Sequence, residues 1–194
     1  MSLEISEPSN VVITTSRNPT PIIRTFCNDL TRSIPSSVRI NRGKSSLNAL
    51  AEKAFVCGAE KIIVSDRWKG GLGKIQLFEL GNVGLVRVYP TLYVKKLKLH
   101  REFGHIRTKK VKSLVVQASN QNPIGVRRLA IALSNFLNVS KLPIKRALSG
   151  DAVIMSISLN PAQRMQITFL QTTPKKIEIG PQITISHLIW TPRK

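Results

Sequence analysis

The stretch Val11-Val-Ile-Thr-Thr-Ser-Arg-Asn-Pro-Thr20 decides the expected fold. Its β-branched residues 11–16 predict a strand, and the Arg-Asn-Pro-Thr that follows predicts a turn. Thr20 suits the N-cap of a helix and Pro21 its first position, while Pro35 ends it. Apolar residues recur there at helical spacing. We expect the buried stripe of this helix to comprise Ile22, Ile23, Phe26, Cys27, Leu30 and Ile34.

The chain continues with a second α-helical unit and a hairpin. A short strand near 38–40 leads through Asn41-Arg-Gly-Lys-Ser45 to a helix over about 46–57, with Gly58 as its C-terminal cap. Strands are predicted at 61–65, 74–80 and 84–89. The second helix is expected to bury Leu47, Leu50, Ala51 and Ala54.

The second half of the sequence repeats the opening pattern of strand, Asn-Pro loop and helix. A strand at 114–119 precedes Asn122-Pro123 and a helix, about 104 residues after the first Asn-Pro, and strands follow at 152–159, 163–170, 175–179 and 183–189. Either the chain is internally duplicated or two ordinary β-α units coincide. Duplication predicts an α/β (α+β) fold of two pseudo-repeated halves, each a mixed sheet with helices. Their bounds are 1–97 and 114–194, with a basic connector over 98–113. The third helix is expected to bury Val126, Leu129, Ala130, Leu133 and Leu137.

The charge of the chain is strongly unbalanced. Its 194 residues include 30 Lys+Arg against 10 Asp+Glu, a formal net charge of +20, while 42% of residues are hydrophobic. A basic protein with an ordinary core usually binds a polyanion. No apolar run reaches the length of a membrane span, and the acidic N-terminus lacks an apolar signal segment, so we expect a protein that is not secreted and has no membrane contact.

Cations gather where helices are predicted to begin. They oppose the helix dipole, at about 0.3–1 kcal/mol each when exposed, but helix N-termini also favour phosphate. The pattern predicts contacts to a nucleic-acid backbone; the alternative is arginine scattered over a basic surface. The candidate contacts at helix starts are Arg17, Arg24, Arg42, Lys44, Arg127 and Arg128. A supporting basic strip within 94–112, or else a merely solvated connector, holds Lys95, Lys96, Lys98, Lys109 and Lys110.

Catalytic, metal and cofactor signals are weak. The acids are scattered, and His100, His105 and His187 have no neighbouring ligand residues, so no metal is expected. Arg42-Gly43-Lys44-Ser45 resembles the end of a phosphate-binding loop, but Val38 stands where its first glycine belongs, so no nucleotide cofactor is expected.

Cysteine and aromatic residues are sparse. Cys27 and Cys57 are interpreted as buried free thiols. Phe26, Phe55 and Phe136 are assigned to core packing, and aromatic residues make up only 5% of the chain. We therefore expect recognition of the nucleic-acid backbone, with little base readout.

Two blocks carry a family resemblance. Ile13-Thr-Thr-Ser-Arg-Asn-Pro19, then Phe26, then Ile40-Asn-Arg-Gly-Lys44 resembles the opening of Brix-domain ribosome-biogenesis proteins of the compact archaeal type. Ile177-Glu-Ile-Gly-Pro181 resembles the E-[IV]-G-P-R signature near that family's end, although Gln182 replaces the arginine and leaves a phosphate contact there in doubt. The resemblance implies halves similar to the anticodon-binding domain of class II aminoacyl-tRNA synthetases.

The resulting hypothesis is a non-enzymatic RNA-binding assembly factor. The resemblance implies that its partners are precursor rRNA and other ribosome assembly proteins. Because extended charged tails are absent, it also implies an archaeal cytoplasmic protein. The alternatives are an RNA-modifying or nucleotide-dependent enzyme, which would need a carboxylate cluster, metal site or intact phosphate loop, and a permanent basic ribosomal or scaffold protein.

Overall fold

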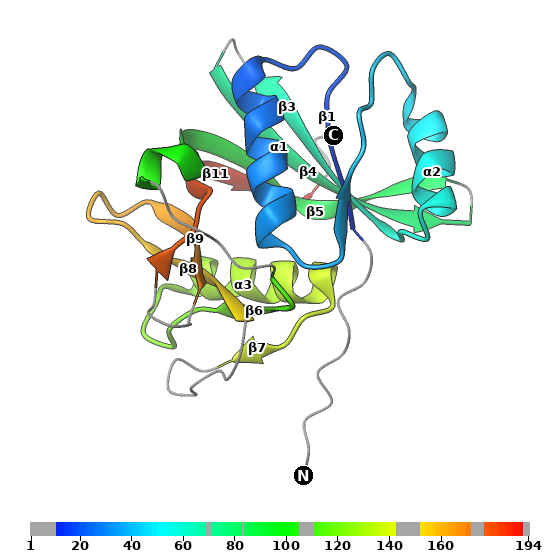
Figure 1. Cartoon of the computed structure of the whole chain (residues 1–194). Coiled ribbons are helices and arrows are strands. Elements are labelled where there is room, and N and C mark those ends of the chain that lie inside the picture. The colour runs from blue at the N-terminus through cyan, green and yellow to red at the C-terminus, as the bar shows by residue number, and fades with distance from the viewer. Residues whose placement is uncertain are drawn as a thin grey trace.

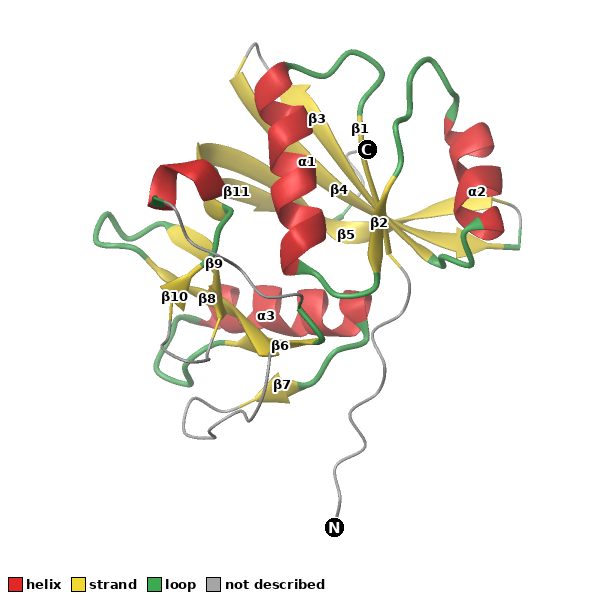
Figure 2. Cartoon of the chain, in the orientation of Figure 1, coloured by secondary structure: helices red, strands yellow, loops and turns green. Residues whose placement is uncertain are grey.

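The chain forms one long, curled mixed sheet with helices packed against it (Figure 1). The computed structural model describes residues 11–68, 71–82, 84–104, 111–142, 152–171 and 177–191 (Figure 2). The elements of the first half are β1 (Val11–Thr15), α1 (Pro21–Ser33), β2 (Ser37–Arg39), α2 (Leu47–Val56), β3 (Lys61–Trp68), β4 (Gly71–Gly81) and β5 (Gly84–Lys98). After a 3-10 helix, His100–Phe103, come β6 (Ser113–Gln117), α3 (Ile124–Leu137), β7 (Lys141–Leu142), β8 (Ala152–Leu159), β9 (Met165–Gln171), β10 (Ile177–Glu178) and β11 (Gln182–Ile189). None of the helices in the described residues is long and apolar enough to cross a membrane.

The same strand order occurs twice. In the first half β1 pairs in parallel with β2 and β3, and β3, β4 and β5 continue antiparallel. In the second half β6 pairs in parallel with β7 and β8, and β8, β9 and β11 continue antiparallel. Antiparallel pairing of β5 with β11 joins the two sets into the order β2-β1-β3-β4-β5-β11-β9-β8-β6-β7, with β10 on β9.

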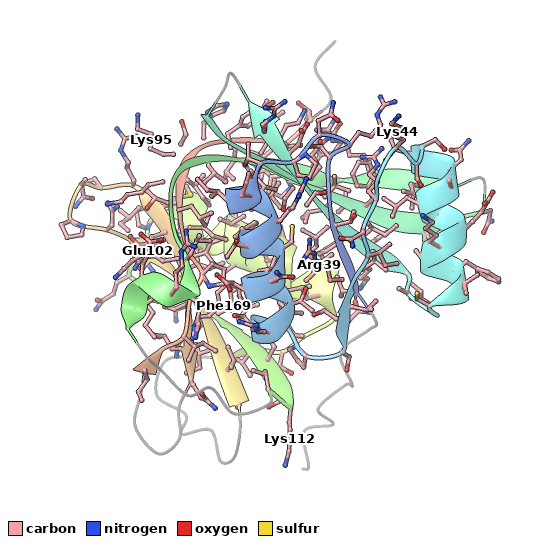
Figure 3. The ribbon with its side chains drawn as sticks, turned by 45° about the horizontal axis from the view of Figure 1, so that its top comes forward. Arg39, Lys44, Lys95, Glu102, Lys112 and Phe169 are labelled. Atoms are coloured by element: carbon pink, nitrogen blue, oxygen red, sulfur yellow. The ribbon has the colours of Figure 1, made fainter. Side chains whose placement is uncertain are left out.

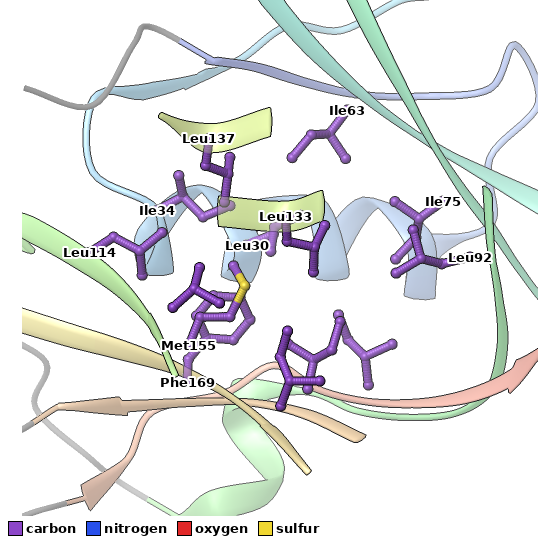
Figure 4. Close-up of a cluster of buried hydrophobic side chains, with 14 of the residues drawn as sticks. Leu30, Ile34, Ile63, Ile75, Leu92, Leu114, Leu133, Leu137, Met155 and Phe169 are labelled. Atoms are coloured by element: carbon purple, nitrogen blue, oxygen red, sulfur yellow. The ribbon is translucent and has the colours of Figure 1, made fainter. Parts of the chain in front are cut away.

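The main core lies between the halves. Leu30 and Ile34 of α1 and Leu133 and Leu137 of α3 pack with apolar side chains from both sets of strands (Figure 4). Alternation along β1 decides which face each residue serves: Ile13 joins this core, while Val12 belongs to a smaller cluster under α2. α1 and α2 therefore cover opposite faces of the first half, and α1 and α3 share one core.

A polar joint fastens the end of α1 to the second half. The carboxylate of Asp29, almost fully buried, accepts a hydrogen bond from the backbone N–H of His100 (2.9 Å), and Ser33 Oγ donates to the carbonyl of Gly180 (2.6 Å). His100 Nδ1 lies 2.5 Å from the carbonyl oxygen of Ile179. These contacts span up to 147 residues of sequence, so the joint helps to fix one half against the other.

The predicted elements are largely confirmed. Thr20 caps α1, accepting from the N–H of Ile23 at 3.4 Å, and Gly58 follows α2 with a φ of 66°. The third helix has the expected buried stripe. β5 extends nine residues beyond the predicted end at 89 and finishes at Lys98. Because β5 pairs with β11 along this extension, Val94–Lys98 belongs to a strand rather than to a connector.

Several burial predictions are wrong. Leu47 is 39% exposed because it lies in the first turn of its helix, before the stripe that faces the sheet. Ile22 is 48% exposed although Ile23 is buried, because one residue turns the helix by about 100° and leaves Ile22 to one side of the stripe. Cys57 is exposed because α2 ends at Val56, whereas Cys27 is buried as expected. Phe55 is 74% exposed and contributes little to the core, in contrast to Phe26 and Phe136.

Candidate nucleic-acid interface

Four arginines surround one hollow at the start of α1. The carboxyl ends of β1 and β2 meet there, because the two strands run in parallel. The hollow measures about 310 Å³. Its lining residues are Thr15, Arg17, Pro19, Arg24, Arg39, Asn41, Arg42 and Gly43. None of these described lining residues is acidic, so the hollow has the charge and the N–H donors that a phosphate requires.

Arg39 is anchored by two amides. Its guanidinium donates to the side-chain oxygens of Asn28, on α1, and of Asn41, the latter at 3.3 Å. Its Nε is buried and has no hydrogen-bond partner in the described part of the chain. Asn28 follows Arg24 by one helical turn, so the polar row of α1 flanks the hollow.

Arg42 is held by its own loop in a strongly positive setting. Its Nε donates to the carbonyl of Ser45 at 3.1 Å, and Gly43 takes a φ of 57°, which permits the tight turn. Burial lowers the pKa of the Arg42 guanidinium; the positive charge of Arg17 lowers it further, and Asp66 acts in the opposite direction. Arg17 and Arg42 are thus close enough to repel each other, which an anion between them would offset.

Lys44 belongs to the same loop but does not line the hollow. Its side chain is exposed and lies near the start of α2 (Figure 3). Ser46 caps that helix, with its Oγ accepting from the N–H of Ala49 at 3.1 Å. Lys44 therefore adds positive charge beside the hollow.

The candidate cations of the second half lie at the start of α3. Arg127 and Arg128 are exposed, as expected for its early turns. Arg128 stacks over the ring of Trp190, with its guanidinium carbon 4.0 Å from the ring centroid. This stack joins α3 to the residue after β11, a contact between positions 62 residues apart that the sequence pattern did not indicate.

The lysines of the predicted basic strip lie in different surroundings. Lys95 and Lys96 are exposed on β5, and Figure 3 shows Lys95 well away from Lys44. Lys98 instead places its ammonium 3.9 Å from the centroid of the Phe103 ring. Lys109 and Lys110 lie outside the described residues. The structure thus brings Arg17, Arg24 and Arg42 together and leaves the lysines of β5 as a separate feature.

Sequence reasoning missed two kinds of residue. Arg39 ends a strand parallel to β1, and that position was a usable signal for its place in the hollow. Tyr93 and His187 stack across β5 and β11 with ring centroids 4.3 Å apart, a pairing that depends on long-range register. Within the described residues no group of three potential metal ligands is found.

Comparison with known proteins finds relatives that share one description. No protein-family model matches the sequence. A probable Brix domain-containing ribosomal biogenesis protein of Sulfurisphaera tokodaii is 30% identical over 115 residues, which cover 55% of this chain and 65% of that relative. A relative with the same description from Methanopyrus kandleri is 26% identical over 179 residues, or 88% of this chain and 90% of its own. The chain is similar to Brix domain-containing ribosomal biogenesis proteins.

The fold of the chain agrees with a solved structure. A probable ribosomal biogenesis protein from Aeropyrum pernix superposes with a TM-score of 0.73 at 24% identity, covering 93% of this chain and 99% of that one. The aligned segment of the Sulfurisphaera relative amounts to just under two thirds of that protein.

The Glu178-Ile-Gly-Pro181 motif sits at the joint between the halves. Gly180 has a φ of 61°, and a Cβ placed on it would lie 2.9 Å from the Phe103 ring, so the close packing requires glycine. Gln182 donates to the Glu178 carboxylate at 2.8 Å, within the signature itself. The motif therefore has a structural use in this chain.

Proposed function

We propose that this chain is a Brix-domain protein and a non-enzymatic, RNA-binding assembly factor in ribosome biogenesis. The observation that carries the proposal is the hollow at the start of α1, where four arginines converge without a lining carboxylate. The chain's net charge of +20, and the description of its relatives as probable ribosomal biogenesis proteins, support RNA as the polyanion.

The hollow is proposed to hold a phosphate of precursor rRNA. Arg17, Arg24, Arg39 and Arg42 would supply charged donors, with Lys44 beside them. Arg39 is already oriented by Asn28 and Asn41, which lowers the entropy lost on binding. Further phosphate contacts are proposed for the remaining predicted cations, Lys95, Lys96, Lys98, Lys109, Lys110, Arg127 and Arg128.

The two halves are proposed to descend from one duplicated unit similar to the anticodon-binding domain of class II aminoacyl-tRNA synthetases. Support comes from the strand order, which is the same on both sides of the β5–β11 seam. On this proposal the protein works in the archaeal cytoplasm, holding immature rRNA segments until other assembly proteins displace it.

Salt dependence of RNA binding tests the proposal. Affinity for a fluorescent precursor-rRNA fragment should fall steeply with salt, because several phosphates are neutralised. Replacing Arg42 and Lys44 with Gln should weaken binding across sequences and reduce the log–log slope by about two.

A pair of distant cations supplies the control. Lys112→Gln with Arg164→Gln removes the same charge from two exposed positions that do not line the hollow, and should change the affinity less. A slope near zero for the unmodified protein contradicts RNA binding through phosphates. Equal effects of the two pairs remove the hollow from the binding site.

A further inference from the structure

A second, larger groove lies beside α2. It has a volume of about 910 Å³ and is formed by the end of α2, the β3–β4 pair and the turn after β4, with one residue from the C-cap of α3. Its lining residues are Ala51, Glu52, Phe55, Val56, Glu60, Lys61, Glu79, Leu80, Gly81, Asn82, Gly84 and Asn138. The arginine hollow shares none of these residues.

Two large apolar side chains are open to solvent in this groove. Phe55 is 74% and Val56 85% exposed, although both lie in the last turn of a helix that buries Leu50 and Ala54. Adjacent exposed apolar residues on a rim of polar ones mark an interaction surface. An exposed phenylalanine is also the kind of side chain that anchors a partner.

The groove is acidic in a strongly basic chain. Glu52, Glu60 and Glu79 line it together with a single cation, Lys61. Lys61 is opposite Glu79 in the β3–β4 register and is mostly buried, with its ammonium 5.9 Å from the Phe136 ring centroid. Burial lowers the pKa of Lys61, and Glu79 and Glu60 oppose that shift. Three carboxylates against one ammonium leave the surface negative.

The other acids of the described residues are already engaged within the fold. They are Asp29 with the His100 N–H, Asp66 with Lys74, Glu102 with the Leu99 N–H, and Glu178 with the Gln182 amide. By contrast, Glu52, Glu60 and Glu79 form no ion pair within the described residues: no Lys, Arg or His nitrogen there lies within 4.0 Å of their carboxylate oxygens. The free carboxylates of the described part of the chain thus collect at one groove.

We propose that this groove docks a basic segment of a partner protein, with an apolar side chain of that segment packed on Phe55 and Val56. Charge complementarity selects this occupant: carboxylates repel RNA, whereas lysine or arginine side chains would pair with Glu52, Glu60 and Glu79. A symmetric pair formed by a second copy would set like-charged grooves against each other. The protein would then hold RNA on one surface and a basic protein on another.

A peptide-binding experiment tests this docking site. The probe is a short fluorescent peptide with lysines flanking a central leucine, compared with a peptide carrying glutamate for lysine and one carrying serine for leucine. We expect saturable binding of the first peptide only. Phe55→Ser with Val56→Ser should weaken it by about tenfold or more, as should Gln at Glu52, Glu60 and Glu79 together.

Matched variants separate the groove from general surface effects. Ile124→Ser with Ile131→Ser removes two exposed apolar side chains outside the groove and should leave peptide binding unchanged. The Phe55→Ser, Val56→Ser protein should retain its affinity for RNA, so failure here and failure of RNA binding are distinguishable. Absence of saturable binding, equal binding by the groove variants, or preference for the acidic peptide overturns the proposal. Sedimentation showing a dimer that the Phe55→Ser, Val56→Ser protein cannot form also overturns it, since the occupant would be a second copy.

Discussion

The starts of α1 and α3 occupy equivalent places in the two halves but present different surfaces. Each helix follows the central strand of a parallel trio and carries an arginine as its fourth residue, Arg24 in α1 and Arg127 in α3. At α1 three further arginines complete a hollow, whereas at α3 Arg128 stacks on Trp190. The repeated scaffold therefore sets one cation in common, and the loops and neighbouring strands give each half its own surface.

The helix caps differ in the same way. Thr20 satisfies an N–H of α1 through its side chain, while Pro123 provides no such bond to α3. In the second half Asn122 instead donates to the carbonyl of Ile157 at 3.3 Å, which ties the loop to β8. A repeat of secondary structure thus does not imply a repeat of the binding site.

The largest expected effect on RNA affinity comes from removing positive charge at the start of α1 and not at the start of α3. Gln at Arg17, Arg24 and Arg42 should weaken binding to a precursor-rRNA fragment by about 100-fold at low salt, since roughly three phosphate contacts are lost. Gln at Arg127, Arg128 and Arg164 removes the same charge from the second half and should weaken binding less. Fluorescence anisotropy over a salt series measures both; a larger loss for the second triplet would reverse the proposed ranking of the halves.

Breaking the polar joint at the end of α1 should lower the stability of both halves together. Asp29→Ala leaves the partly buried His100 N–H without its acceptor, and we expect the free energy of unfolding to fall by about 1–3 kcal/mol. Asp66→Ala, at a partly exposed ion pair, should cost under about 1 kcal/mol. Urea unfolding followed by circular dichroism should show one transition in each protein, because α1 and α3 share a core. Two separated transitions would show that the halves unfold independently.

Loss of the Arg128–Trp190 stack should reduce RNA affinity only modestly. Trp190→Leu removes the ring but no charge, so RNA affinity should fall only about two- to fivefold, with the salt slope unchanged. Arg128→Gln should give a similar loss and also reduce the slope by about one. Titrations at matched salt distinguish the two. An unaltered affinity in both variants would confine the stack to a structural role.

The smallest functional effect is expected at the cysteines, which both lie in the first half. Burial raises the pKa of the Cys27 thiol to about 11, whereas Cys57 is exposed. A disulfide reagent at pH 8 should therefore modify Cys57 quickly and Cys27 only on unfolding, without loss of RNA affinity on Cys57 modification. Rapid modification of both thiols in the native protein would show that α1 opens from β1 on its own.

The same thiol gives a pH dependence of known sign. The folded pKa of Cys27 lies above the unfolded value of 9.0, so its contribution to stability is complete below pH 9 and is lost as the pH rises toward 11. Cys27→Ala should reduce the decline in unfolding free energy over that interval. An identical decline in the variant would assign it to other groups.

Local patterns sufficed for much of the fold. Periodicity, Thr20, Pro21 and Gly58 located the helices because capping and amphipathic spacing depend on neighbouring residues. Exposure at the helix ends was not predictable in the same way. Leu47 and Phe55 fit an apolar pattern, but whether a helix turn meets the sheet depends on where the sheet ends.

The arginine hollow was foreseen only in part. Arg17, Arg24 and Arg42 were selected because they flank predicted helix starts, and parallel pairing of β1 and β2 brings them together. Arg39 enters through that pairing, and Trp190 reaches Arg128 through the register of β11 against β5. The acidic groove combines α2, β4 and Asn138, which are distant in sequence, so no local pattern could indicate it.

The anchored end of α1 has a mechanical consequence. The helix is 13 residues and about 20 Å long. Arg24 lies in its first turns, while Asp29 and Ser33, toward its other end, hydrogen-bond to the backbone of His100 and Gly180. Because its C-terminal end is fixed, we expect α1 to resist tilting when a ligand binds at its N-terminal end. An RNA strand held in the hollow would therefore keep a set distance and angle to any molecule bound on the second half.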